Sequence, residues 1–138
     1  SLHSLWFNAQ CEPVNRILGP TFVPWYGPEA VVERFGGAAV YYPPGAFGQN
    51  NLEIAERIVA HVRALVPDGA TVAEFYGGVG AIGLSLLRGV ASIRINEVGA
   101  ESLQGLAMGI AALDDAARAK VSIVPGRAGE ALAAAEGA

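Results

Sequence analysis

A glycine-rich stretch that follows an apolar run constrains the fold of this chain more than any other feature. The run, residues 71–73 with Phe75, is partly β-branched, as in a buried parallel strand, and three glycines follow within residues 77–80. An apolar helix is expected over residues 81–87. Glycines at a strand-to-helix turn permit close approach of a ligand, and the helix N-terminus adds unpaired N–H groups. The stretch therefore predicts an α/β fold with a nucleotide-like ligand at this turn.

Two glutamates accompany the turn. Glu97 ends a second apolar run, residues 91–97, about 20 residues after the glycines, where a carboxylate at a strand tip binds ribose hydroxyls. Glu74 directly precedes the glycine motif, where its charge would repel a pyrophosphate and attract a cationic methionine group. This favours S-adenosylmethionine as the ligand, with NAD as the alternative and a turn that serves only packing as a third interpretation.

The residues after position 48 alternate between helical and strand patterns. A helix is expected to begin after an N-cap at Asn50 or Asn51 and to run to about Val66. Further helices are expected over residues 100–113 and 128–135, and a third strand over residues 120–124. This order indicates a parallel sheet with right-handed crossovers. The residues expected to form the buried stripe of the 100–113 helix are Leu103, Leu106, Ala107 and Ile110.

Residues 1–48 have a different character. Short strands are expected at residues 5–8, 31–35 and 38–42, the last two joined by a Gly-Gly turn, whereas residues 17–28 are rich in turn formers and aromatics. We expect a small antiparallel β segment at 1–48, followed by a second unit at 49–138.

Composition excludes several function classes. The net charge is −4 with 16% charged residues, which argues against binding nucleic acid by charge alone. No apolar run is long enough to cross a bilayer, so no membrane association is expected. The single cysteine, Cys11, excludes an internal disulfide and suits a cytoplasmic protein. His3 and His61 have no partners at metal-ligand spacing, so no metal is expected.

Three motifs together resemble a known family. They are Leu5-Trp-Phe-Asn-Ala with Asn15-Arg-Ile-Leu-Gly, Pro44-Gly-Ala-Phe-Gly-Gln-Asn-Asn, and Glu74-Phe-Tyr-Gly-Gly-Val-Gly. Over residues 6–127 the pattern resembles the RNA 5-methyluridine (uracil-C5) methyltransferases, a branch of the class I S-adenosylmethionine-dependent enzymes. The resemblance implies half of a Rossmann-like sheet, with its strands ordered three, two, one, and an RNA substrate.

The resemblance also implies roles for individual residues. Gln49 matches a glutamine that reaches both cofactor and target base, and Phe47 matches the aromatic beside it, so both are expected to bind substrate. Tyr76 and the glycines match the residues that contact the methionine part of the cofactor. The residues expected to bind the cofactor are Gln49, Glu74, Tyr76, Gly78, Gly80, Glu97 and Arg127.

The sequence departs from the family at three positions and in its extent. Glu74 replaces an aspartate, Gly77 a cysteine and Ala81 a threonine or asparagine, and each change weakens a cofactor contact. In the family, a cysteine that adds to uracil C6 and a base that removes the C5 proton lie beyond the third strand. Because Cys11 precedes the cofactor fold, we expect no catalytic residue here.

We therefore expect the cofactor-binding part of an RNA (uracil-5-)-methyltransferase that is inactive alone. A degenerate fold kept as an interaction module, or an NAD-binding domain, is the alternative. Without further strands, the strand Thr71–Phe75 would leave an open sheet edge. We expect a second copy, a partner chain or the N-terminal segment to cover it.

Overall fold

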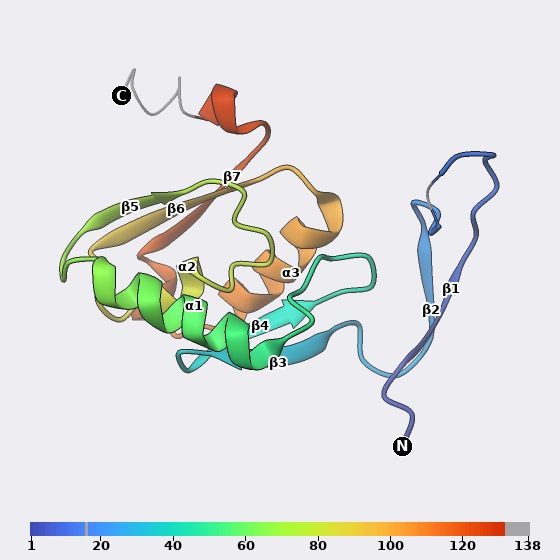
Figure 1. The fold of residues 1–138 in the computed structure, drawn as a ribbon, viewed down its shortest axis with the longest axis horizontal. Coiled ribbons are helices and arrows are strands. Elements are labelled where there is room, and N and C mark those ends of the chain that lie inside the picture. The colour runs from blue at the N-terminus through green and yellow to red at the C-terminus, as the bar shows by residue number, and fades with distance from the viewer. Residues whose placement is uncertain (16, 132–138) are drawn as a thin grey trace.

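The computed structural model describes residues 1–15 and 17–131, and its centre is a parallel sheet (Figure 1). The sheet contains β5 (Thr71–Glu74), β6 (Ser92–Glu97) and β7 (Val121–Pro125), in the order β5-β6-β7. Both pairings are parallel. The predicted parallel sheet and its three-two-one order are therefore confirmed.

Helices pack on one face of this sheet. Figure 1 shows α1 (Leu52–Leu65), α2 (Gly83–Leu86) and α3 (Ala100–Ala111) on the same side of the strands. The core between the layers is aliphatic, and its most deeply buried side chains are Ile93, Ile95 and Leu106. None of the described helices is long and apolar enough to cross a membrane.

The helix boundaries follow local capping. The Asn51 side chain accepts the N–H of Ile54 at 3.1 Å and so begins α1 where the sequence predicts. The helix expected at 81–87 is shorter, because the positive φ angles of Gly78 (59°) and Gly80 (86°) keep the chain in a turn. The short α4 (Asp115–Arg118) was not predicted; the Asp114 carboxylate caps it at 2.7 Å from the N–H of Ala117.

The last predicted helix is described only in part. Residues 128–131 are helical, as expected, and the rest of the predicted 128–135 helix lies outside the described residues.

The hairpin of β3 (Val31–Phe35) and β4 (Ala38–Tyr42) forms as predicted, but it packs beneath the helices. Its Val40 is fully buried in a cluster with Ala55, Val59 and Val79. The hairpin therefore shares a core with the second unit. The boundary at residue 48 stays a prediction. The residues before and after it share one hydrophobic cluster, so they do not have separate cores.

A second antiparallel pair, β1 (Leu5–Asn8) with β2 (Phe22–Tyr26), projects from the rest of the molecule (Figure 1). The sequence analysis placed no strand at residues 22–26, and that was wrong. Pro24 pairs with Trp6 beside an irregularity in the register, and proline in a sheet is confined to such bulges and to strands with an unpaired edge. Among the described residues the N-terminal strands pair with each other and not with β5, so they do not extend its open edge.

Candidate functional site

The turn after β5 is held against β6 by its backbone. The Gly77 N–H donates to the Asn96 carbonyl at 2.9 Å, and the Gly80 N–H donates to the Gly77 carbonyl at 2.9 Å. Tyr76 and Gly78 have φ angles of 57° and 59°. A Cβ atom added at Gly78 would meet no atom within 4 Å, so the turn leaves open space beside its backbone. The space is the kind of cradle that a ligand can enter.

Glu97 lies beside this turn at the tip of β6. Its Oε2 accepts the N–H of Gly78 at 2.8 Å, and its Oε1 accepts the N–H groups of Val98 and Gly99 at 2.7 Å each. Burial raises the pKa of this carboxyl, but the donors of Gly99, Val98 and Gly78 outweigh it and leave the pKa below its ordinary value. Glu97 is therefore ionised, with about one of its roughly four lone-pair positions still available.

Glu74 has the opposite environment. Its side chain turns inward toward Gly83 and Ile95, and a Cβ atom added at Gly83 would overlap its Oε2. This oxygen is buried without a hydrogen-bond partner in the described part of the chain. Burial raises the pKa of Glu74 to about 7, only partly opposed by the backbone of Gly83. At neutral pH the carboxyl is close to half protonated, so it does not carry the fixed negative charge that the sequence argument assumed.

The structure brings the two motifs together in one cavity of about 170 Å³. Phe47 and Gln49 come from the loop before α1, whereas Glu74, Tyr76 and Gly78 come from β5 and the glycine turn. The side chains of Phe47 and Tyr76 are 74% and 79% exposed, respectively, so both rings are accessible to a ligand. The apolar wall comes from β3, β4 and α1 and includes Phe35, Tyr42, Ile58 and Val59.

Three of the expected site residues, Gly80, Glu97 and Arg127, do not line this cavity. Gly80 has a φ angle of 86°, which favours glycine, and a Cβ atom added there would lie 2.6 Å from Leu106 Cδ1, the end of a flexible side chain. Arg127 follows β7 and is exposed. The N–H of Gly126 donates to the Glu97 carbonyl at 2.9 Å, which brings the Arg127 segment to the same edge of the sheet without placing it in the cavity.

Asn96 is a positioning residue that the sequence analysis missed. It is 4% exposed, and its Nδ2 donates to the carbonyls of Val124 and Gly126 at 2.8 and 2.9 Å. It thereby ties the end of β7 to the strand that ends in Glu97. The available signal was a polar side chain at the end of an otherwise buried strand.

The structure shows the surroundings of Gly77, which replaces a cysteine of the family, and of Cys11, the single cysteine of this chain. A Cβ atom at Gly77 would overlap Ile95 Cγ2, so Ile95 occupies the space that a side chain there would need. Cys11 is an exposed free thiol in the connection between β1 and β2, and it does not line the cavity.

Comparison with known proteins supports the resemblance. No family model matches the sequence. A curated protein, the "Uncharacterized RNA methyltransferase pc1998" of Protochlamydia amoebophila, is 32% identical over 100 residues, which are 72% of this chain and 26% of that protein. The chain thus spans about a quarter of the length of the relative it matches.

Solved structures share the fold. The Pyrococcus abyssi tRNA (uracil-54, C5)-methyltransferase, in complex with S-adenosyl-L-homocysteine, superposes with a TM-score of 0.72 at 20% identity, over 91% of this chain and 31% of that one. Trm5b from P. abyssi gives a TM-score of 0.63 at 12% identity, over 91% and 37% of the two chains. This chain is therefore similar to RNA methyltransferases in sequence, and its fold is that of the class I S-adenosylmethionine-dependent methyltransferases.

Proposed function

We propose that this chain is the S-adenosylmethionine-binding part of an RNA (uracil-C5) methyltransferase. The observation that carries the proposal is the single cavity that joins Phe47 and Gln49 to the glycine turn. The structural neighbour that was solved in complex with S-adenosyl-L-homocysteine supports the choice of ligand.

The residues present fit this cofactor. Gly78 leaves open space where a side chain would stand. Glu74 lines the cavity but its Oε2 is buried and lacks a partner in the described part of the chain, so its carboxyl would have to turn toward the cavity to accept a hydrogen bond from a ligand ammonium group. Glu97 keeps an acceptor position for a ribose hydroxyl. The cavity of about 170 Å³ is below the roughly 300 Å³ of a typical small-molecule pocket, so it would hold the methionine part, and Glu97 and Arg127, which lie outside it, would be left to contact the nucleoside.

When bound, the cofactor supplies an electrophilic methyl group. The residues that line the cavity would hold it: Glu74 would bind the ammonium group, Tyr76 would cover the methionine part, and Gln49 and Phe47 would contact a target base. The methyl transfer needs a thiolate and a base. Because Cys11 lies on the projecting ribbon, we propose that this segment binds the cofactor without carrying out the transfer.

Calorimetry with S-adenosyl-L-homocysteine tests the proposal, and the chain offers a matched pair of glycines for it. Gly78 and Gly69 both have positive φ angles, and an added Cβ meets nothing within 4 Å at either position. Gly78→Ala and Gly69→Ala therefore impose similar backbone strain, but only the first fills the cradle. We expect Gly78→Ala to weaken binding about tenfold or more, equivalent to about 1.4 kcal/mol, and Gly69→Ala to change it little.

Folded wild-type protein that releases no heat at millimolar ligand contradicts the proposal. NAD in the same titration separates the two cofactor classes. Tighter binding of NAD than of S-adenosyl-L-homocysteine favours the dehydrogenase-like alternative, and binding of neither favours an interaction module.

We also propose that a second copy or a partner chain covers the open edge of β5. The support is that, in the described residues, β5 pairs only with β6.

A further inference from the structure

A second and larger cavity lies at the opposite end of the parallel strands from the glycine turn. It has a volume of about 590 Å³. Its walls include Arg88, which precedes β6, and Lys120, which directly precedes β7, so it opens at the N-terminal ends of these strands. The remaining walls come from the β3–β4 hairpin with Arg34, from α2 and α3, and from the residues around α4. It shares no lining residue with the cavity that holds Gln49 and Glu74.

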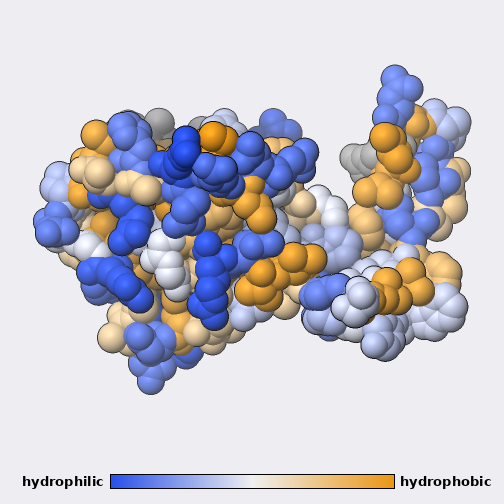
Figure 2. Space-filling view, turned by 60° about the horizontal axis from the view of Figure 1, so that its bottom comes forward, coloured by the Kyte–Doolittle hydropathy of each residue, from blue (hydrophilic) through white to orange (hydrophobic). Residues whose placement is uncertain are grey.

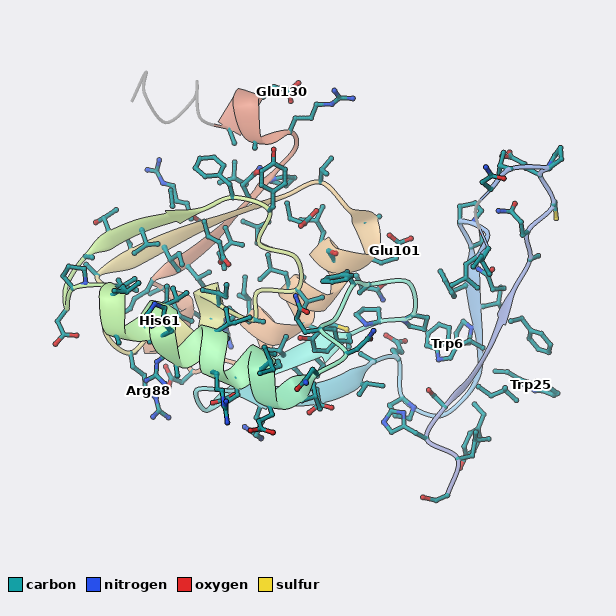
Figure 3. All side chains as sticks on the ribbon, viewed as in Figure 1. Trp6, Trp25, His61, Arg88, Glu101 and Glu130 are labelled. Carbon is teal, nitrogen blue, oxygen red and sulfur yellow. The ribbon has the colours of Figure 1, made fainter. Side chains whose placement is uncertain are left out.

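Basic side chains converge on this cavity. Arg34, Arg88 and Lys120 line it, and the guanidinium of Arg63 lies against the adjoining turn, with its Nη1 2.7 Å from the position of a Cβ added at Gly36. These four are among only nine Lys and Arg residues in a chain of net charge −4. Figure 3 shows Arg88 at the lower left of the α/β part, and Figure 2 shows strongly hydrophilic side chains gathered over the underside.

These cations lack carboxylate partners. In the described part of the chain the ion pairs are Arg57–Glu53 and Arg118–Asp115, and neither involves the four. Lys120 Nζ donates to the Leu87 carbonyl at 3.0 Å, which fixes its position and uses one of its three donors.

The acidic groups nearby are already engaged in backbone hydrogen bonds. Asp114 lines the cavity, but its Oδ1 caps α4 at 2.7 Å from the N–H of Ala117. Glu56 accepts the N–H of Gly36 at 3.2 Å. The hollow is therefore lined by three basic side chains, Arg34, Arg88 and Lys120, against one acidic side chain, Asp114.

We propose that this cavity binds phosphate groups. Arginine forks match phosphate oxygens in a bidentate manner, and lysine adds a point charge, so Arg34, Arg88 and Lys120 form a suitable donor set. The hollow is large enough for more than one phosphate. The phosphates belong either to an RNA backbone, which rests on the proposed function and gives the RNA a second contact remote from the cofactor, or to a free phosphate or polyphosphate.

Two binding measurements test the site and separate the sources. The first is calorimetry with tripolyphosphate at low ionic strength on the wild type and on the double variant Arg34→Gln/Arg88→Gln. Arg57→Gln is the matched control, because it removes an arginine that does not line the cavity. The second measures binding of a single-stranded RNA oligonucleotide to the same proteins over a range of salt concentrations.

We expect the double variant to lose tripolyphosphate binding by about tenfold or more, while Arg57→Gln stays within about twofold of the wild type. If the double variant also loses RNA affinity, the site is assigned to an RNA backbone. In that case the slope of log affinity against log salt concentration should fall by the equivalent of about two phosphate contacts. Loss of tripolyphosphate binding alone assigns it to a free phosphate ligand. If tripolyphosphate does not bind and the double variant binds RNA as the wild type does, the proposal is overturned, whatever the result for S-adenosyl-L-homocysteine.

Discussion

Two glutamates of the candidate site show how the backbone decides the state of a side chain. Glu97 receives three N–H groups and has a lowered pKa, whereas Glu74 is buried with an unpartnered oxygen and a pKa of about 7. The difference comes from the donors that each backbone position supplies. In the proposed function, Glu97 would offer a permanent charge to the nucleoside, and Glu74 would become fully charged only when a cation is beside it.

The raised pKa of Glu74 predicts a pH-dependent stability. Its pKa is about 7 in the folded protein and 4.5 ordinarily, so between these values the folded state retains a proton that the unfolded state releases. The stabilisation is fully present below pH 4.5 and is lost as the pH rises through 7, by about 3 kcal/mol at most. Urea unfolding from pH 5 to pH 8 should show this fall in the wild type relative to Glu74→Gln.

Glu53→Gln serves as the control, because Glu53 is an exposed member of an ion pair on α1. Its unfolding free energy should follow that of the wild type across the pH range. Parallel pH profiles for the wild type and Glu74→Gln would mean that Glu74 is ionised in the folded protein.

At the scale of elements, the sequence predicted those whose signal is local. The Asn51 cap and the Gly36–Gly37 turn each act within a few residues, and α1 and the β3–β4 hairpin form where they were expected. In α3 the expected buried stripe was only partly correct: Leu106 is fully buried, but Ala107 is exposed, and Gly105 and Gly109 are buried instead. A helical pattern cannot show that a hairpin distant in sequence will press its backbone against a helix.

This packing predicts different costs for two similar substitutions in α3. A Cβ at Gly105 would overlap the backbone carbonyl oxygen of Tyr41, whereas a Cβ at Gly109 would first meet the terminal Cδ1 of Leu84 at 2.7 Å. Both Gly→Ala changes gain up to about 1 kcal/mol of helix propensity. We expect Gly105→Ala to lower the unfolding free energy by about 2 kcal/mol and Gly109→Ala to change it by less than about 1 kcal/mol, measured by urea denaturation. Equal effects would show that β4 moves away from α3 freely.

The candidate site, like the helices and strands, was predictable where its signal lies in a local sequence motif. The motifs identified Phe47, Gln49 and the glycine turn, and the structure brings them into one cavity. The sequence could not show that Glu74 turns inward under Gly83 or that Asn96 ties β7 to β6, because both depend on contacts between separate strands. Gly80 was expected to bind the cofactor; it does not line the cavity, and its φ angle of 86° favours glycine at this position.

At the scale of the whole molecule, the chain consists of an α/β body and a projecting ribbon with separate stabilisation. Neither hydrophobic core cluster contains a residue of β1 or β2. The ribbon has a stacked pair of its own, Phe7 and Trp25, with ring centroids 4.8 Å apart. Figure 3 shows Trp25 on the side of the ribbon away from the body and Trp6 on the side toward it.

The position of the tryptophans makes this division measurable. Both tryptophans of the chain, Trp6 and Trp25, lie in the ribbon, so tryptophan fluorescence reports on the ribbon, whereas far-ultraviolet circular dichroism reports mainly on the helices of the body. An isolated two-stranded ribbon is marginally stable in water. We therefore expect the fluorescence transition in urea to precede the dichroism transition, which violates two-state behaviour. The variant Trp25→Ala, which removes the stacking with Phe7, should shift only the fluorescence transition of Trp6 to lower urea. Coincident transitions in both proteins would instead show that the ribbon and the body unfold as one cooperative unit, joined at the hollow that Phe22, Pro44 and Glu101 line.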